Sequence, residues 1–159
     1  MNVIDNFLPE DVFLKIKNDL LSLDFPWYYS SAVASDQDDI DFYFNHNFYE
    51  FESSRSSWCH KIVNPLLGKL TFNNLVRARA NLYTRKTEPV PNGFHIDQSY
   101  RHTVALFTIN TNNGYTLFKD GTKHPSVENT MLLFDGSLEH ASVAQTDEKV
   151  RVNINLNLI

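Results

Sequence analysis

Two side chains that commonly bind metal ions stand two residues apart in the stretch GFHIDQ, positions 93–98: His95 and Asp97. If this stretch is an extended strand, the side chains of residues i and i+2 point to the same face. An imidazole and a carboxylate then lean toward one point and offer two ligands. A metal that performs chemistry needs a third protein ligand and open coordination positions. The third ligand has to come from elsewhere in the chain.

Among the six histidines, His140 has the surroundings expected of that third ligand. It follows the turn-like DGSLE after the apolar strand candidate TMLLF, and it opens a further strand candidate, HASVAQ. We expect a packed or surface role for His46 and His60, in the aromatic N-terminal half, and an ordinary surface role for His102 and His124, beside strand candidates. Two histidines and one carboxylate are the ligand set of nonhaem Fe(II) oxygenases. The sequence therefore predicts a metal site made of His95, Asp97 and His140.

The last strand candidate, VRVNINLNLI at positions 150–159, has two different faces at period two. One face is apolar and consists of Val152, Ile154, Leu156 and Leu158. The other is polar and consists of Arg151, Asn153, Asn155 and Asn157. Asparagine is a poor strand former, so this row is more typical of a cavity lining than of a solvated sheet face, which is the alternative. An H-x-D motif alone is a weak signal of a metal site. The presence of Arg151 on this polar face strengthens that signal. Arg151 could also pair with Asp147 or Glu148.

A second strand candidate, positions 75–85, repeats this division between faces. Its polar side carries Arg77, Arg79, Asn81 and Tyr83, and its other side carries Val76, Ala78, Ala80 and Leu82. We expect the apolar face of 150–159 to lie beneath helices predicted at 9–23 and 55–70. We expect the side chains of Arg151 and Tyr83 to point inward, toward the metal.

Length and composition bound the class of protein. At 159 residues the chain is long enough for one domain with a sizeable core, and 42% hydrophobic and 13% aromatic residues indicate an ordered globular protein. The net charge of -5 without a cationic cluster argues against strong nucleic-acid binding. A single cysteine, Cys59, excludes an internal disulfide. The N-terminus resembles neither a signal peptide nor a membrane span, so we expect a cytoplasmic protein without membrane association.

The order of predicted elements favours an α+β fold. A helix over 9–23 and two consecutive short helices over 55–70, with Asn64 as a cap before Pro65, precede most of the strands. Strand candidates follow at 75–85, 102–110, 129–136, 140–145 and 150–159, divided by the turns TNNG, KDGT and DGS. This order predicts an antiparallel sandwich or barrel with helices on one outer face.

Several segments resemble the Fe(II)/2-oxoglutarate-dependent oxygenases, prolyl-4-hydroxylase-like branch. VIDNFLPEDVFLKIKNDL is similar to the opening strand and helix of that branch, and NGYTLF to its G-G-x-T-x-F turn. HPSVENTMLLFDGSLEHASVAQ resembles the segment leading into the distal histidine, and KVRVNINLNLI the closing strand. The resemblance implies a double-stranded β-helix (jelly roll). It also implies one oxygenase domain over 1–159, with a helical support region, 1–74, and a catalytic jelly-roll core, 75–159.

The resemblance also implies cofactors and roles. Fe(II) would be held by His95, Asp97 and His140, and 2-oxoglutarate by Arg151, with Tyr83 and Asn81 as neutral partners. The catalytic residues are then the three ligands and Arg151. Dioxygen would be consumed, succinate and CO2 released, and ascorbate could stimulate turnover. Arginine suits the distal carboxylate of 2-oxoglutarate, because its planar fork can bond both oxygens.

The substrate stays open at this stage. The N-terminal segment, 3–20, and the compact length favour hydroxylation of a peptidyl, prolyl-type C–H bond. NLY at 81–83 is similar to an element of the AlkB-like nucleic-acid demethylases, but Asn157 stands where that branch has a second arginine. A small-molecule substrate, a nonenzymatic jelly-roll binding module and a cupin with another metal are alternatives. The acidic loop 36–41 could favour a basic protein substrate, and the oligomeric state is left open.

Overall fold

The computed structural model describes residues 1–33 and 42–159. The predicted acidic loop, with Asp36, Asp38, Asp39 and Asp41, lies outside these described residues, so its role stays a prediction. The elements are β1 (Asn2–Ile4), α1 (Glu10–Leu20), β2 (Tyr28–Ser30), β3 (Tyr43–Glu50), β4 (Ser53–Ser54), α2 (Cys59–Ile62), α3 (Asn64–Leu67), β5 (Leu75–Thr84), β6 (Thr103–Thr108), β7 (Asn112–Phe118), β8 (Lys123–Ser126), β9 (Thr130–Asp135), β10 (His140–Val143) and β11 (Val150–Leu158).

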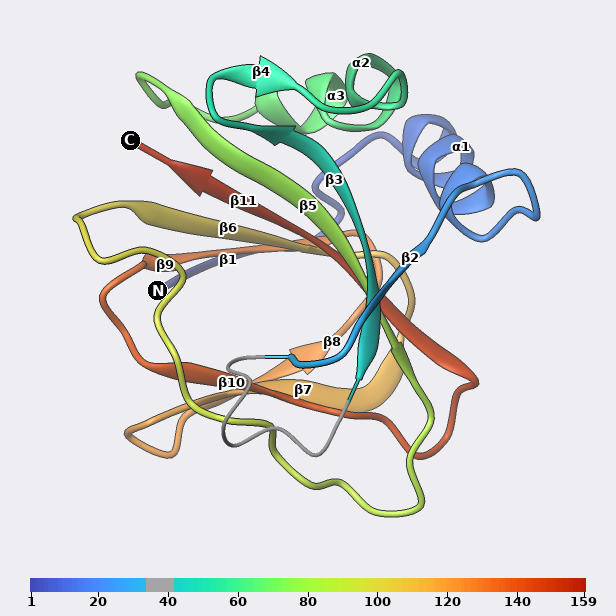
Figure 1. Ribbon diagram of the computed structural model, residues 1–159, viewed down its shortest axis with the longest axis vertical. Coiled ribbons are helices and arrows are strands. Elements are labelled where there is room, and N and C mark those ends of the chain that lie inside the picture. The colour runs from blue at the N-terminus through green and yellow to red at the C-terminus, as the bar shows by residue number, and fades with distance from the viewer. Residues whose placement is uncertain (34–41) are drawn as a thin grey trace.

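The strands form two antiparallel sheets. The larger has the order β1-β9-β6-β11-β5-β3-β2, with β4 paired to β3, and the smaller has the order β10-β7-β8. Figure 1 shows the helices on the outer side of the large sheet, while the small sheet lies on its opposite side. The predicted α+β class, with mainly antiparallel strands and N-terminal helices packed on one sheet, is confirmed.

An irregular segment continues the small sheet beyond β10. Pro91 forms an isolated antiparallel bridge with Val143, and His95 forms another with His140. The His95 and His140 backbones exchange two N–H···O bonds of 3.0 Å each. Backbone pairing therefore places the two histidines directly opposite each other, although they are far apart in sequence.

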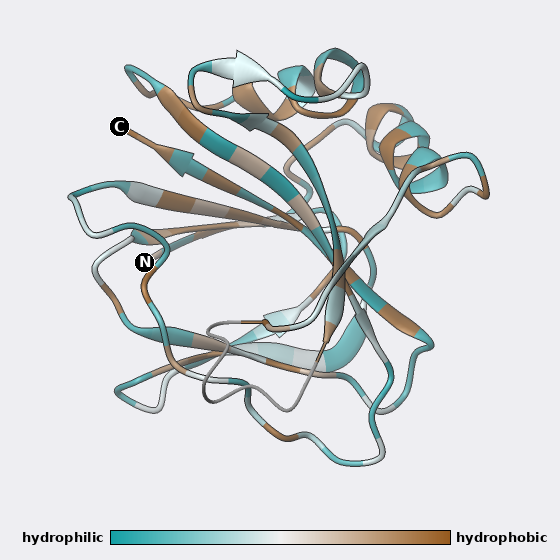
Figure 2. Cartoon of the chain, viewed as in Figure 1, coloured by the Kyte–Doolittle hydropathy of each residue, from teal (hydrophilic) through white to brown (hydrophobic). Residues whose placement is uncertain are grey.

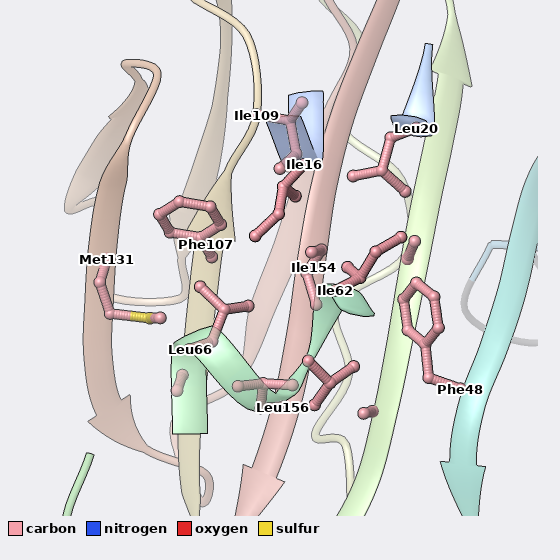
Figure 3. Packing of buried hydrophobic residues seen from close by; sticks show 14 of the residues in the cluster. Ile16, Leu20, Phe48, Ile62, Leu66, Phe107, Ile109, Met131, Ile154 and Leu156 are labelled. Carbon is pink, nitrogen blue, oxygen red and sulfur yellow. The ribbon is translucent and has the colours of Figure 1, made fainter. Parts of the chain in front are cut away.

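The core lies between the large sheet and the helices. Val152, Ile154 and Leu156 of β11 are completely buried, and Leu158 nearly so. They belong to one cluster with Phe13, Ile16 and Leu20 of α1 and Ile62 and Leu66 of the short helices. Figure 3 shows Ile154 and Leu156 of β11 together with the helical side chains Ile16, Leu20, Ile62 and Leu66. The prediction that the apolar face of β11 lies beneath the helices is confirmed, and Figure 2 shows hydrophilic and hydrophobic residues alternating along β5 and β11.

The helices begin and end differently from the prediction in two places. Helix α1 starts after Pro9 and ends at Leu20, so Leu23, the last residue of the predicted helix 9–23, lies outside it and is fully exposed. Asn64 does not cap α3, because Val63 already has helical backbone angles and Asn64 lies in the first turn. The Asn64 side chain instead contacts His60 Nδ1 at 2.7 Å.

The N-terminal half contains more strand than expected for a helical support region. Strands β2, β3 and β4 extend the large sheet past β5. The sequence of β3, YFNHNFYE, places ring side chains at alternate positions 44, 46 and 48 and suits a pleated surface, and its Phe48 is fully buried. The stretch TNNG was also wrongly predicted as a turn. Most of it lies in β7, where the register shifts after Asn112 and Asn112 Oδ1 accepts from Gly114 N–H.

No helix in the described part of the chain is long and apolar enough to cross a membrane.

Candidate active site

The structure brings the three predicted metal ligands together. Ligand atoms of His95, Asp97 and His140 all lie within 4.8 Å of one another, and His95 Nε2 is 3.9 Å from Asp97 Oδ1. The stretch GFHIDQ, which contains His95 and Asp97, was assumed to be an extended strand. It is not one, because only His95 in this stretch makes a β-bridge. Phe94 and Ile96, between and beside the ligands, are more than one-third exposed, so the stretch lies over the sheet rather than within a core.

Both histidines present the same ring nitrogen to the centre of this cluster. His95 Nδ1 lies 3.1 Å from the Gly93 carbonyl oxygen, and His140 Nδ1 lies 3.0 Å from the Leu138 carbonyl oxygen. A carbonyl oxygen only accepts, so each Nδ1 carries the proton and each Nε2 keeps a lone pair. Backbone carbonyls commonly orient metal-binding histidines in this way. Burial also lowers the pKa of His140, which favours the neutral imidazole that a metal requires.

The spacing fits a divalent transition-metal ion after a small contraction. Nitrogen and oxygen ligands lie about 2.0–2.2 Å from such an ion, so neighbouring ligands of an octahedron are about 3 Å apart. The observed separations reach 4.8 Å. Each ligand atom would therefore move inward by less than about 1 Å, which side-chain rotation can supply.

Three residues that the sequence analysis did not assign to the site hold Asp97. Asn155 and Asn157 of β11 donate to Asp97 Oδ2 at 2.8 and 2.9 Å, and Arg77 NH2 of β5 lies 3.1 Å from Oδ1. Burial alone would raise the pKa of Asp97, but Arg77 and the two amides outweigh it and hold the pKa at about 2. The carboxylate is therefore ionised, which a metal ligand requires.

Arg151 is a buried cation surrounded by hydroxyl groups. Its Nε donates to Ser126 Oγ at 2.8 Å, NH1 to Ser142 Oγ, and NH2 to Thr116 Oγ1 at 3.4 Å. Within the described ranges, no carboxylate lies within ion-pair distance of it. Gly114 leaves room for this side chain, because a Cβ there would lie 2.9 Å from Arg151 Cδ. A buried, unneutralised guanidinium is costly unless an anion joins it, so this position suits an anionic ligand.

The side chains of Tyr83 and Arg151 lie side by side and point inward, as predicted, and Asn81 lines the same cavity. The Arg151 guanidinium lies 5.4 Å from the centre of the Tyr83 ring. Burial raises the pKa of Tyr83 to about 12, so its hydroxyl stays protonated and can donate a hydrogen bond. Asn81 Nδ2 donates to Asn153 Oδ1 at 2.9 Å. Arg151 and Tyr83 are direct partners in the β11–β5 register, as are Asn153 and Asn81.

Two adjoining cavities meet at this cluster and share Asn81, Tyr83, His95 and Asn155. The inner one, about 40 Å³, is lined by His140, Ser142, Thr116 and Arg151. The outer one, about 190 Å³, is lined by Tyr43, Arg77, Arg79, Ile96 and Asp97 among others. The inner cavity holds little more than water as it stands, so a larger ligand there requires its lining side chains to rotate.

The remaining histidines lie apart from the three-ligand cluster. His46 is buried in β3, with Pro26 O and Ser56 Oγ each 2.7 Å from its ring nitrogens. His60 is exposed, as allowed. His102 and His124 were wrongly predicted as surface residues, since both are buried. His102 packs on the backbone at Gly136, and His124 is enclosed within β8, so tertiary packing that a linear pattern does not reveal covers both.

The sequence matches no family model and no curated protein, whereas solved structures match over its full length. A prolyl-4-hydroxylase from Pseudomonas putida has a TM-score of 0.62 at 12% identity, covering 99% of this chain and 91% of that one. A prolyl hydroxylase from Trichoplax adhaerens, solved with a peptide fragment of the hypoxia inducible factor oxygen degradation domain, has a TM-score of 0.67 at 15% identity, with coverages of 99% and 82%.

A third match differs in its reaction. The non-heme α-ketoglutarate-dependent epimerase SnoN from nogalamycin biosynthesis has a TM-score of 0.64 at 12% identity, covering 99% of this chain and 76% of that one. Identities this low establish the fold, and function has to be argued from the site. The chain has the double-stranded β-helix, or jelly-roll, fold of these matched structures, as the sequence resemblance implied.

Proposed function

We propose that this chain is an Fe(II)- and 2-oxoglutarate-dependent dioxygenase that hydroxylates an unactivated C–H bond, with release of succinate and CO2. The observation that carries the proposal is one continuous site. Three ligand side chains converge within 4.8 Å, and a buried arginine without a carboxylate partner among the described residues lines the cavity that adjoins them. A ligand cluster alone also fits a cupin, and a buried arginine alone fits many anions. The ligand cluster and the adjoining arginine together suit a metal ion and a dicarboxylate cosubstrate.

The residues of the site have different roles according to their position. His95, Asp97 and His140 would hold Fe(II), which, when bound, supplies the dioxygen chemistry that couples decarboxylation of 2-oxoglutarate to hydroxylation. Arg77, Asn155 and Asn157 keep Asp97 ionised and fix its orientation. Three protein ligands leave positions open on a six-coordinate ion for the cosubstrate and dioxygen.

Arg151 would bind the distal carboxylate of 2-oxoglutarate. Its fork can bond both carboxylate oxygens, and the Tyr83 hydroxyl and the Asn81 amide add neutral hydrogen bonds. The hydroxyls of Ser126, Ser142 and Thr116 orient the guanidinium without neutralising it. The apolar side chains of Val104, Leu106 and Phe134 line the same cavity and exclude water from it.

We further propose a peptidyl, prolyl-type substrate. Two of the matched structures are prolyl hydroxylases, one of them in complex with a peptide. A groove of about 690 Å³ shares the lining residue Arg77 with the metal-site cavity, and its walls include the exposed rings of Phe51 and Tyr100. This groove has room for residues that flank a target residue.

The rival functions fit the site less well. An AlkB-like demethylase is disfavoured because Asn157 supports Asp97 and because the net charge is -5. A cupin without cosubstrate, or a nonenzymatic binding module, has no need of a buried cation beside the ligands. A small-molecule hydroxylase uses the same site and stays the second candidate, because one matched structure is the epimerase SnoN.

We also propose that residues 1–159 act as one domain.

The proposed function is tested by measuring succinate formed from 2-oxoglutarate with Fe(II), dioxygen and ascorbate, with and without a panel of prolyl peptides. We expect iron-dependent succinate formation, and stimulation by peptides that are substrates. Absence of any iron-dependent 2-oxoglutarate consumption by folded protein contradicts the enzyme assignment. Consumption that no peptide stimulates but a small molecule does contradicts only the peptidyl substrate.

A further inference from the structure

Arg79 lines the outer cavity at the level of the metal ligands. It is a direct register partner of Asn155 on β11 and of Asn47 on β3. Asn155 donates to Asp97, so Arg79 stands one strand away from a residue that holds a metal ligand. Tyr83, beside Arg151, lies four residues further along β5, which is about 13 Å of strand. Arg79 is thus placed beside the metal and away from the proposed distal carboxylate of 2-oxoglutarate.

The charges that line this cavity do not balance. Its described lining includes three charged side chains, Arg77, Arg79 and Asp97, apart from His95. Arg77 and Asp97 neutralise each other at 3.1 Å. The carboxylate nearest to Arg79 in the described structure is that of Glu50, at 3.8 Å from NH2, and Glu50 is not part of the cavity lining. Among the described lining residues, Arg79 is therefore the cation whose carboxylate partner, Glu50, lies outside the cavity.

The hydrogen bonds of Arg79 are also long. Its Nε lies 3.3 Å from Asn47 Oδ1, and its NH1 lies 3.4 Å from the Tyr43 hydroxyl. Charge-assisted bonds of a well-paired guanidinium are about 2.7–2.9 Å. The side chain is 24% exposed and has five N–H donors. An entering anion can bind it without breaking a short bond.

We propose that Arg79 is the centre of a carboxylate-binding subsite, and that the substrate presents a carboxylate to it while the target C–H bond faces the metal ligands. The inference rests on the proposed function and narrows its substrate class. A carboxylate fits because the planar guanidinium bonds two oxygens at once, and the neighbouring Tyr43 hydroxyl can donate a further hydrogen bond. The carboxylate comes from an acidic residue next to the target in a peptide, or from a free small acid.

The experiment compares matched ligands on protein loaded with Mn(II) and 2-oxoglutarate, which does not turn over. One arm uses a prolyl heptapeptide library in which each Asp or Glu member has its Asn or Gln counterpart. The other arm uses L-proline and L-prolinamide. We expect the carboxylate forms to bind about tenfold to a hundredfold more tightly than the amides, the range of one charge-assisted contact. The arm that shows this preference identifies the source of the carboxylate.

Variants locate the preference at one residue. Arg79→Gln should abolish it, and Arg79→Lys should restore it only in part. Arg85→Gln, an equal change of charge at an exposed residue just beyond β5, should leave it intact. Equal binding of carboxylates and amides, persistence of the preference in Arg79→Gln, or binding of no member of either arm overturns the subsite.

Failure of the subsite and failure of the proposed function are distinguishable. The affinity of the parent protein for 2-oxoglutarate, and the succinate that it forms without added substrate, report on the proposed function alone. If both are normal and the carboxylate preference is absent, only the subsite is wrong. If the parent neither binds 2-oxoglutarate nor consumes it, the proposed function is wrong.

Discussion

The β5–β11 pair has an outer face toward the helices and an inner face toward the metal ligands. Both faces contain fully buried residues, yet they are stabilised by different interactions. The outer face packs Ala78, Ala80 and Ile154 against the helices with no exposed surface. The inner face buries Arg151 and Asn157 almost as completely, at 3% and 0% exposure. The burial of a residue therefore does not tell whether it belongs to the hydrophobic core or to the candidate site. A buried polar group costs free energy unless each of its hydrogen bonds is satisfied, so a row of such groups indicates function more than stability.

Some hydrogen-bonding groups of the inner face have no partner, which adds to the difference between the two faces. Arg77 Nε and Asn157 Oδ1 are buried and have no hydrogen-bond partner among the described residues. Both side chains also bond Asp97. Substitutions on the outer face should therefore lower stability, whereas those on the inner face should lower ligand binding with smaller effects on stability.

The largest expected effect is the loss of a metal ligand. His95→Ala, Asp97→Ala and His140→Ala should each abolish Fe(II)-dependent turnover and weaken Mn(II) binding beyond detection by titration, because two ligands hold a labile ion poorly. Circular dichroism should show that each variant is folded. His60→Ala, at an exposed histidine, is the control and should bind metal normally. An alanine variant with parental metal affinity contradicts the three-ligand site.

Substitutions on the outer face should lower the stability of the protein. Ile154→Ala should lower the free energy of unfolding by about 2–5 kcal/mol, because it opens a cavity in the helix-covered core. Denaturant unfolding measures this change, and Val127→Ala, at a 43% exposed position, should alter it little. Metal affinity measured below the unfolding transition should stay unchanged in Ile154→Ala. A loss of metal affinity without a loss of stability reverses the roles assigned to the two faces.

Arg151 should show a graded response in cosubstrate binding. Arg151→Ala should weaken 2-oxoglutarate binding to the Mn(II)-loaded protein about ten- to a hundredfold or more, since it removes a charge-assisted contact of about 1.5–3 kcal/mol. Arg151→Lys should recover part of the loss. Tyr83→Phe should cost only about 0.5–1.5 kcal/mol, one neutral hydrogen bond. Isothermal titration gives all three values, and equal affinities in the three variants exclude the assigned role.

The residues behind Asp97 should affect metal binding less than the three metal ligands do. Arg77→Gln should weaken Mn(II) affinity about tenfold to a hundredfold, the usual range for a partner of a metal ligand, and leave the metal-binding stoichiometry at one. Arg55→Gln, at an exposed arginine bonded to the Glu50 carbonyl, is its charge-matched control. Unchanged affinity in Arg77→Gln means that Asn155 and Asn157 alone position Asp97.

Much of the site could be predicted because its chemistry has a linear pattern. Period-two alternation assigned Arg151 and Tyr83 to the inner face, and residue types and spacing picked out His95, Asp97 and His140. The carboxylate partner of Arg77 could not be predicted, because the contact depends on where an irregular loop crosses the sheet. The strand register accounts for the contact: Arg77 pairs with Asn157, so both side chains reach Asp97 from adjacent strands.

The fold was predicted less completely in the N-terminal half. In β3, Phe44, His46 and Phe48 alternate with asparagines and tyrosines, a pattern that competes with helical spacing in a short aromatic segment. Pairing with β5 decides the outcome, and that partner is distant in sequence. His102 and His124 were misplaced for the same reason, because long-range packing and not the local pattern buries them.

The coupling between metal and cosubstrate tests the continuous site most directly. If 2-oxoglutarate contacts both the metal and Arg151, the two ligands must strengthen each other's binding by the same factor. Titration of 2-oxoglutarate into Mn(II)-loaded and metal-free protein should show an affinity at least about tenfold higher with the metal. Mn(II) titrated with and without 2-oxoglutarate should give the same ratio. Equal affinities in the presence and absence of the partner ligand contradict a single continuous site on the inner face.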